Sequence, residues 1–374
     1  YNQSKGQLNH YFNKVSNNKF HLIPAVETHA NNTNQDGIIT VTLPGNHPNP
    51  QGDGDFVQKL VDALTIADSY IDFSTYDVSD DGILNKSDLQ IMFLVAGYET
   101  SATGSPDPSV WAHKWCVFGQ EGGVNPPTLD GVSILSCLND GNGYSRFGER
   151  QFADGHDATI GIIAHELGHA IWGLPDLYDT DGSSSGIGNF GLMGGGSWGY
   201  VEGESPGATP VHPTAWTKIE TGWFSPDDTA GAKTMYRTED NLYNIVKVDI
   251  TTDTSEYFLI ENRGAAGYDL GLFMLTDIPS GTPFQGGIAI WHIDASQDTN
   301  SNEARKLVDL EEAANPGLDD DIDRGKSTNL FWDTNNATFD DNSTPDSKDY
   351  SATASGVSIT NISDRKADMT LIVN

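Results

Sequence analysis

Hydrophobic spacing divides the first part of the chain into helices and strands. Over residues 56–70, Phe56, Leu60 and Leu64 recur at the three-to-four-residue spacing of a helix. Residues 158–172 form a second apolar, helix-like stretch, which Gly173 and Pro175 end. Residues 8–26 predict a helix leading into a strand, 40–43 a short strand, 89–97 a buried strand and 213–223 a further helix. The intervening residues 182–207 are rich in glycine and serine and predict a loop.

The character of the chain changes after about residue 224. Short segments typical of strands occur at residues 244–250, 257–261, 287–293, 357–362 and 369–373, separated by connections rich in Asp, Asn and Gly. We therefore predict an α+β protein with a mixed domain over residues 1–225 and a mostly β, sandwich-like domain over residues 226–374.

The second apolar helix carries a metal-binding pattern, His165-Glu166-x-x-His169. Residues four apart lie on one helix face, so the two imidazoles can bind one zinc ion. Glu166 is placed to take a proton from a zinc-bound water, which would then attack a peptide carbonyl. The alternative is an amphipathic helix whose histidines lie at an interface. The apolar residues before His165 and the turn that ends the helix at Gly173 favour a metal site.

A catalytic zinc usually has three protein ligands and a water. Asp176 is the candidate for the third, because Gly173 and Pro175 turn the chain directly before it. Asp179 is the next candidate and Asp181 a weaker one.

Composition narrows the possible partners. The chain has 53 acidic and 20 basic residues among 374, a net charge of −33, so nucleic-acid phosphates would be repelled. The longest apolar run, residues 91–97, is far too short to span a membrane. The large negative charge also makes the folded chain repel itself, and bound calcium or ambient salt commonly relieves this repulsion. The two cysteines, Cys116 and Cys137, predict one disulfide in an exported protein, with two buried thiols as the alternative.

Several further motifs accompany the metal-binding helix. They are Gly173-Leu-Pro-Asp176-Leu-Tyr-Asp179, Leu192-Met193-Gly-Gly-Gly-Ser197-Trp198, Lys218 to Trp223, Tyr257-Phe-Leu-Ile-Glu261-Asn262-Arg263, Gly287 to Asp294 and Val110 to Trp115. Together they cover nearly the whole chain, which resembles the immune inhibitor A family of secreted bacterial metallopeptidases.

The resemblance implies a metzincin-like catalytic domain followed by a β-rich domain. It implies that Met193 lies in a turn beneath the zinc, as an apolar floor and not a ligand. It also implies a secreted endopeptidase with broad protein substrates and an N-terminal pro-segment. One residue, Trp172, is extra relative to the family spacing between His169 and the glycine. We expect the helix either to run one residue longer or to bulge there.

Two acidic loops are candidate calcium sites. In residues 77–88, Asp77, Ser79, Asp81, Ile83 and Asp88 occupy ligand positions of an EF-hand loop, and a glycine follows the third. The twelfth position is Asp and not the usual Glu, and the alternative is an ordinary Asp-Gly turn. Asp179 and Asp181 form a second candidate, with a polar turn as the alternative.

We therefore expect a secreted, monomeric, calcium-stabilised zinc endopeptidase that acts on proteins or peptides. Tyr200 is a possible oxyanion donor, although packing is the commoner role for a tyrosine. The competing hypothesis is a calcium-dependent binding module with a degenerate, inactive zinc site. The extra residue before Gly173 and the acidic β region are its support.

Overall fold

A computed structural model describes residues 7–29, 35–48, 53–118, 123–276 and 284–374. Contacts divide the chain into two compact units. The first comprises Leu22–Thr159 and Glu166–Gly173, and the second comprises the chain up to His21, Ile160–His165 and Leu174–Asn374. The division between these units falls within the metal-binding stretch, and each unit is described by itself.

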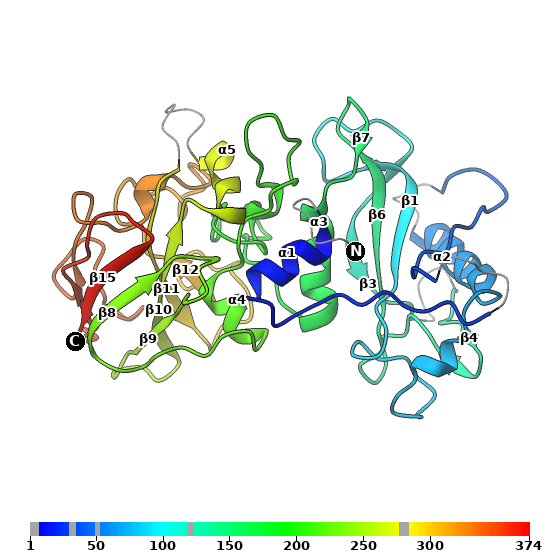
Figure 1. The fold of residues 1–374 in the computed structure, drawn as a ribbon, viewed down its shortest axis with the longest axis horizontal. Coiled ribbons are helices and arrows are strands. Elements are labelled where there is room, and N and C mark those ends of the chain that lie inside the picture. The colour runs from blue at the N-terminus through cyan, green and yellow to red at the C-terminus, as the bar shows by residue number, and fades with distance from the viewer. Residues whose placement is uncertain (1–6, 30–34, 49–52, 119–122, 277–283) are drawn as a thin grey trace. The chain divides into compact units, whose positions relative to one another are not determined.

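The first unit is built on a mixed sheet with the order β2-β1-β6-β3, in which β7 also pairs with β6. The long strands β1 and β6 run parallel side by side, and the short β3 is antiparallel to β6 at the edge (Figure 1). The strands are β1 (Met92–Glu99), β2 (Ser109–Val110), β3 (His113–Trp115), β6 (Tyr144–Gln151) and β7 (His156–Asp157). The smaller elements are α2 (Asp53–Ala67), η1 (Phe73–Tyr76), β4 (Thr128–Leu129) and β5 (Val132–Ser133).

The core of this unit joins α2 to one face of the sheet. Phe56, Leu60 and Leu64 of α2 are buried in the same cluster as Tyr144 of β6, with Phe93 and Val95 of β1 packed against it. The helical spacing of the α2 residues is what presents these side chains together.

The second unit contains two four-stranded antiparallel sheets with the orders β12-β11-β10-β9 and β13-β14-β15-β8. The strands are β8 (Gly231–Tyr236), β9 (Val246–Asp249), β10 (Glu256–Gly264), β11 (Gly286–Asp294), β12 (Val308–Leu310), β13 (Phe339–Asp340), β14 (Ser358–Thr360) and β15 (Asp368–Val373). One hydrophobic cluster contains Phe258 and Ile290 of the first sheet and Met369 and Leu371 of the second, so the two sheets share a core.

The second unit also contains several short helices. They are α1 (Leu8–Val15), η3 (Gly195–Trp198), α4 (Ala215–Glu220), η4 (Gly267–Gly271), α5 (Leu272–Thr276) and η5 (Ser327–Asn329). Tyr11 of α1 donates a hydrogen bond to the carbonyl of Val211, 2.7 Å away, and its ring packs edge-on against Tyr268. None of the helices in the described ranges is long and apolar enough to cross a membrane.

The mixed α and β content agrees with the predicted class, and most predicted elements occur. The helices predicted at residues 56–70, 158–172 and 213–223 correspond to α2, to α3 (Ile160–Leu167) with η2 (Gly168–Trp172), and to α4. The strands predicted at 89–97, 244–250, 257–261, 287–293, 357–362 and 369–373 correspond to β1, β9, β10, β11, β14 and β15.

Two predicted strands were wrong. The chain after α1 is irregular up to residue 26, and residues 40–43 are irregular too. Alternation favours a strand only where a neighbouring strand can satisfy the backbone amides and carbonyls. Neither stretch pairs with a neighbour in the sheet order of the first unit.

Candidate metal centre

The first candidate ligand, His165, is held in a defined orientation. It lies on α3, is 5% exposed, and its Nδ1 lies 3.0 Å from the carbonyl oxygen of Leu192. Because a carbonyl can only accept, Nδ1 carries the proton and Nε2 presents its lone pair. Nε2 faces Oδ1 of Asp176 at 3.1 Å. The imidazole thus directs its basic nitrogen toward the proposed third ligand.

The extra residue before Gly173 is accommodated by a π-helical turn. η2 (Gly168–Trp172) follows α3 directly, and the amide of Gly173 hydrogen-bonds to the carbonyls of Gly168 and His169. The bond to Gly168 spans five residues, which is the spacing of a π-helix. Gly173 then adopts a left-handed conformation, with φ of 71°, that ends the helix. The helix therefore bulges, which is one of the two outcomes expected from the sequence.

The bulged helix and the turn after it bring three candidate ligands together. His165, His169 and Asp176 each offer one ligand atom, and these atoms lie within 4.8 Å of one another. Within the described ranges, this is the single group of three or more His, Cys, Asp or Glu side chains that meets this distance. Two imidazoles and one carboxylate are a donor set that suits zinc with an open coordination position.

Glu166 directly follows His165 in the chain, and its carboxylate is oriented by the edge strand β3. The backbone amide of Lys114 donates a hydrogen bond to Oε2 of Glu166, 2.7 Å away. Glu166 is only 6% exposed. A bond from a rigid strand fixes the carboxylate of a side chain that would otherwise rotate about three torsions.

Met193 lies in the turn that supports His165. It is 1% exposed, it follows the Leu192 carbonyl that accepts from His165, and its own carbonyl accepts from the amide of Leu177 at 2.8 Å. This backbone arrangement connects the His165 side chain with the residue after Asp176.

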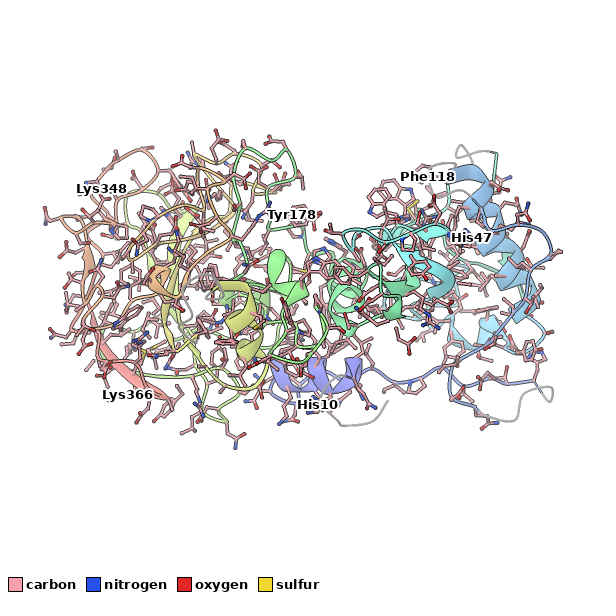
Figure 2. The ribbon with its side chains drawn as sticks, turned by 90° about the horizontal axis from the view of Figure 1, so that it is seen from above. His10, His47, Phe118, Tyr178, Lys348 and Lys366 are labelled. Carbon is pink, nitrogen blue, oxygen red and sulfur yellow. A yellow bond between two sulfur atoms is a disulfide. The ribbon has the colours of Figure 1, made fainter. Side chains whose placement is uncertain are left out.

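Two tyrosines occur near these residues in sequence. Tyr178, labelled in Figure 2, stacks on the ring of His165, with centroids 6.3 Å apart and planes 20° apart. Tyr200 is half-buried, and its amide donates to the carbonyl of Gly271 at 3.3 Å.

The candidate calcium loop at residues 77–88 has an ordered backbone. Asp77 accepts hydrogen bonds from the amides of Asp81 and Gly82, and Asp81 accepts from the amide of Ile83. Gly82 has φ of +77°, and Ile83 forms a bridge with Ser133. The structure does not bring the carboxylates of Asp77, Asp81 and Asp88 to within the spacing reached by the zinc candidates.

Asp179 is committed to hydrogen bonds with its own loop. Its carboxylate accepts from the amides of Asp181 and Ser184, at 2.9 and 2.7 Å, and from the hydroxyl of Ser183 at 2.9 Å. Burial opposes ionisation, but these hydrogen bonds prevail and lower the pKa of Asp179 to about 2. These hydrogen bonds form a polar turn at Asp179, which is the sequence-based alternative to a calcium site there.

The predicted disulfide is confirmed. Cys116 and Cys137 form a disulfide bond, with Cα atoms 5.2 Å apart. This bond closes a loop that begins directly after the edge strand β3. Sequence reasoning did not identify Lys114 and Leu192 as contributors to the site. Both act through backbone atoms, which every residue type has, so no side-chain pattern could have found them.

Comparison with known proteins decides the family. The family described as Immune inhibitor A peptidase M6, catalytic domain, matches residues 2–224, which is more than half of the chain. The chain belongs to the immune inhibitor A peptidase M6 family. The sequence-based resemblance is thereby confirmed, and family membership implies a metallopeptidase domain with a bound metal.

Two curated relatives extend this assignment. Immune inhibitor A of Bacillus thuringiensis subsp. alesti is 32% identical over 205 residues, which are 46% of this chain and 28% of the relative. Pre-pro-metalloprotease PrtV of Vibrio cholerae serotype O1 is 26% identical over 266 residues, which are 59% of this chain and 27% of the relative. The chain thus spans less than a third of the length of these relatives.

Proposed function

We propose that this M6-family chain is a secreted, zinc-dependent endopeptidase in which His165, His169 and Asp176 hold the metal and Glu166 is the general base. The observation that carries the proposal is the convergence of the three ligand atoms to within 4.8 Å. The proton on Nδ1 of His165, bonded to Leu192, supports it because metal-binding histidines typically donate their other nitrogen to a carbonyl.

The roles of the residues follow from their chemistry. A zinc ion, when bound, supplies a Lewis acid that polarises the scissile carbonyl and makes water acidic enough to attack near neutral pH. Glu166 takes the proton of the attacking water and delivers it to the leaving nitrogen. The amide of Lys114 keeps the Glu166 carboxylate in place during both transfers. Tyr200 is retained as a proposed donor to the oxyanion.

Protein substrates fit the surface around β3. Trp111 and Trp115 lie on either side of Lys114 and are 53% and 46% exposed. Among the strands of the described residues, β3 pairs with β6 alone. We propose that an extended peptide binds along this edge, with apolar side chains against the exposed rings.

The proposed architecture is a metzincin-like catalytic domain over residues 1–225, with Met193 beneath the metal, and a sandwich-like β domain over 226–374. The end of the family match at residue 224 supports the boundary, and the shared core of the two four-stranded sheets supports the sandwich. The disulfide and the names of the relatives support secretion. We retain a monomer as the proposed state.

Calcium binding at Asp77, Ser79, Asp81, Ile83 and Asp88 is proposed as the source of stabilisation. Its support is the ordered turn around Asp77 and the positive φ at Gly82, where the EF-hand loop requires a glycine. The strongly acidic composition gives such an ion a stabilising role.

The Glu166→Gln variant tests the function. Glutamine retains an oxygen that can accept from Lys114 but cannot take a proton at neutral pH. We expect one zinc per chain in both proteins, and a fall of about 10²–10⁴-fold in the hydrolysis of unfolded casein by the variant. Equal rates would refute the role of Glu166. Absence of zinc and of hydrolysis in the wild-type chain would favour the inactive binding module.

A further inference from the structure

We propose that Asn300, in the β-rich part of the chain, is a positioning residue for the metal ligand Asp176. Asn300 lies between β11 and β12, more than a hundred residues after the ligand it would serve. The inference rests on the proposed zinc site and assigns part of that site to a region outside the family match.

The side-chain amide of Asn300 is completely buried, and both its nitrogen and its oxygen form hydrogen bonds. Its Nδ2 donates to the carbonyls of Val308 and Leu177, at 2.7 and 2.8 Å, and its Oδ1 accepts from the amide of Val308 at 3.0 Å. The two bonds to Val308 fix the rotation of the amide. The remaining N–H is therefore aimed at Leu177 and at no other group.

Leu177 is the residue directly after Asp176, and both its backbone groups are restrained. Its amide, which belongs to the peptide bond shared with Asp176, donates to the carbonyl of Met193 at 2.8 Å. Its carbonyl accepts from Asn300 and from the amide of Ile187 at 3.0 Å. Leu177 itself is completely buried. The backbone immediately C-terminal to Asp176 is thus held in place by hydrogen bonds.

On the N-terminal side of Asp176, the side chain of Leu174 is buried and the amide of Gly173 is hydrogen-bonded to the preceding helix. Gly173 is exposed and has open space where a Cβ would lie, and Asp176 itself is only partly buried. The hydrogen bonds at Leu177 are therefore one of the constraints that set the position of Asp176 relative to His165. A carboxylate misplaced by about 1 Å cannot complete a tetrahedral site with the two imidazoles.

Asn329 provides a matched control. It is also completely buried in the β-rich region, donates to the carbonyl of Ala314 and to Glu312 at 2.9 and 3.0 Å, and accepts from the amide of Lys326 at 2.6 Å. Its substitution removes a similar set of bonds without touching Leu177. A purely structural role for Asn300 predicts the same consequences for both variants.

The test compares Asn300→Ala with Asn329→Ala in the full chain. Zinc affinity is measured by competition with a chromophoric chelator, the visible absorption of the cobalt-substituted proteins reports the ligand geometry, and thermal unfolding of the metal-free proteins reports stability. We expect Asn300→Ala to weaken zinc binding about tenfold or more and to alter the cobalt spectrum, with Asn329→Ala close to wild type in both, at comparable losses of metal-free stability.

The outcomes are distinguishable. Zinc affinities of the two variants within about twofold of each other, with identical cobalt spectra, would overturn the role of Asn300. If Asn300→Ala does not fold, the same comparison is made with Asn300→Ser, which keeps a shorter donor. A wild-type chain that binds no zinc would instead refute the proposed function, and this inference with it.

Discussion

The chain contains two segments with the composition of metal sites, a bulged helix with its following turn and an acidic loop, and their candidate ligands are arranged differently. Residues 165–176 bring three ligand atoms to within 4.8 Å, whereas the carboxylates of residues 77–88 do not reach that spacing. The first set is held by distant partners, since Leu192 orients His165 and Met193 holds the residue after Asp176. In the second, Asp77 accepts from the amides of Asp81 and Gly82, within its own turn. The comparison indicates that preorganisation of ligands comes from outside the motif.

The largest effect is expected from substitution of a proposed zinc ligand, compared with substitution of a proposed calcium ligand. His169→Ala removes one of the three proposed zinc donors, so we expect no zinc after dialysis and casein hydrolysis at background level. Asp77→Asn should leave the zinc content and the hydrolysis rate unchanged at saturating calcium. Elemental analysis and the casein assay measure both. Loss of zinc from Asp77→Asn would mean that zinc binding at residues 165–176 depends on residues 77–88.

Calcium titration tests the second segment, residues 77–88, directly. If residues 77–88 bind calcium, a concentration 100 times the dissociation constant stabilises the fold by about 2.7 kcal/mol. We expect thermal unfolding to shift upward in the wild-type protein on adding calcium, and the shift to vanish in Asp77→Asn. An undiminished shift in the variant would locate the calcium elsewhere.

Glycines with left-handed backbone offer a matched pair of smaller effects. Gly173 has φ of +71° and Gly82 has φ of +77°, and neither would place a Cβ in a clash. Gly173→Ala and Gly82→Ala should therefore each cost about 1–2 kcal/mol of unfolding free energy, from backbone strain alone. We expect Gly173→Ala to weaken zinc binding as well, because this residue begins the turn toward Asp176. Equal zinc affinity in both variants would contradict the importance of that turn.

The smallest effect concerns acid stability around Asp179. Its folded-state pKa of about 2 lies below the ordinary value of 3.8, so its contribution to stability is complete above about pH 4. That contribution is lost as the pH falls from about 4 toward 2, since the unfolded state then binds the proton first. In urea unfolding, we expect the stability gap between wild type and Asp179→Asn to narrow over this range. A gap that does not change with pH would exclude ionisation as its source.

The sequence predicted those parts of the structure in which burial follows a regular spacing. α2, β10 and β11 have dense apolar patterns, and each occurs within a few residues of its expected bounds. The central strand β6 was not predicted, because Arg146 and Gly148 interrupt its apolar pattern. Arg146 is nevertheless buried, with its guanidinium 4.0 Å from the centroid of Phe56, while the amide of Gly148 donates to Glu99. Such compensation by distant partners leaves no local signal.

The candidate site divides in the same way. His165, Glu166 and His169 follow from helical spacing, and the structure brings a ligand atom of each histidine and of Asp176 to within 4.8 Å of one another. The supporting bonds from Lys114, Leu192 and Asn300 depend on tertiary contacts across 27 to 123 residues of sequence. Spacing alone also could not choose between a longer helix and a bulge after His169, because both add one residue before the glycine.

The π-helical turn at Gly168–Trp172 has a consequence for how members of this family are recognised. An insertion of one residue inside a conventional helix would rotate everything after it by about 100°. Here the widened turn accommodates the residue that the resemblance to the family marks as extra, and the acid lies close to both histidines. Signatures that fix the gap between the second histidine and the acid would therefore overlook chains of this kind. A signature with a variable gap, anchored on the glycine and the acid, would retrieve them.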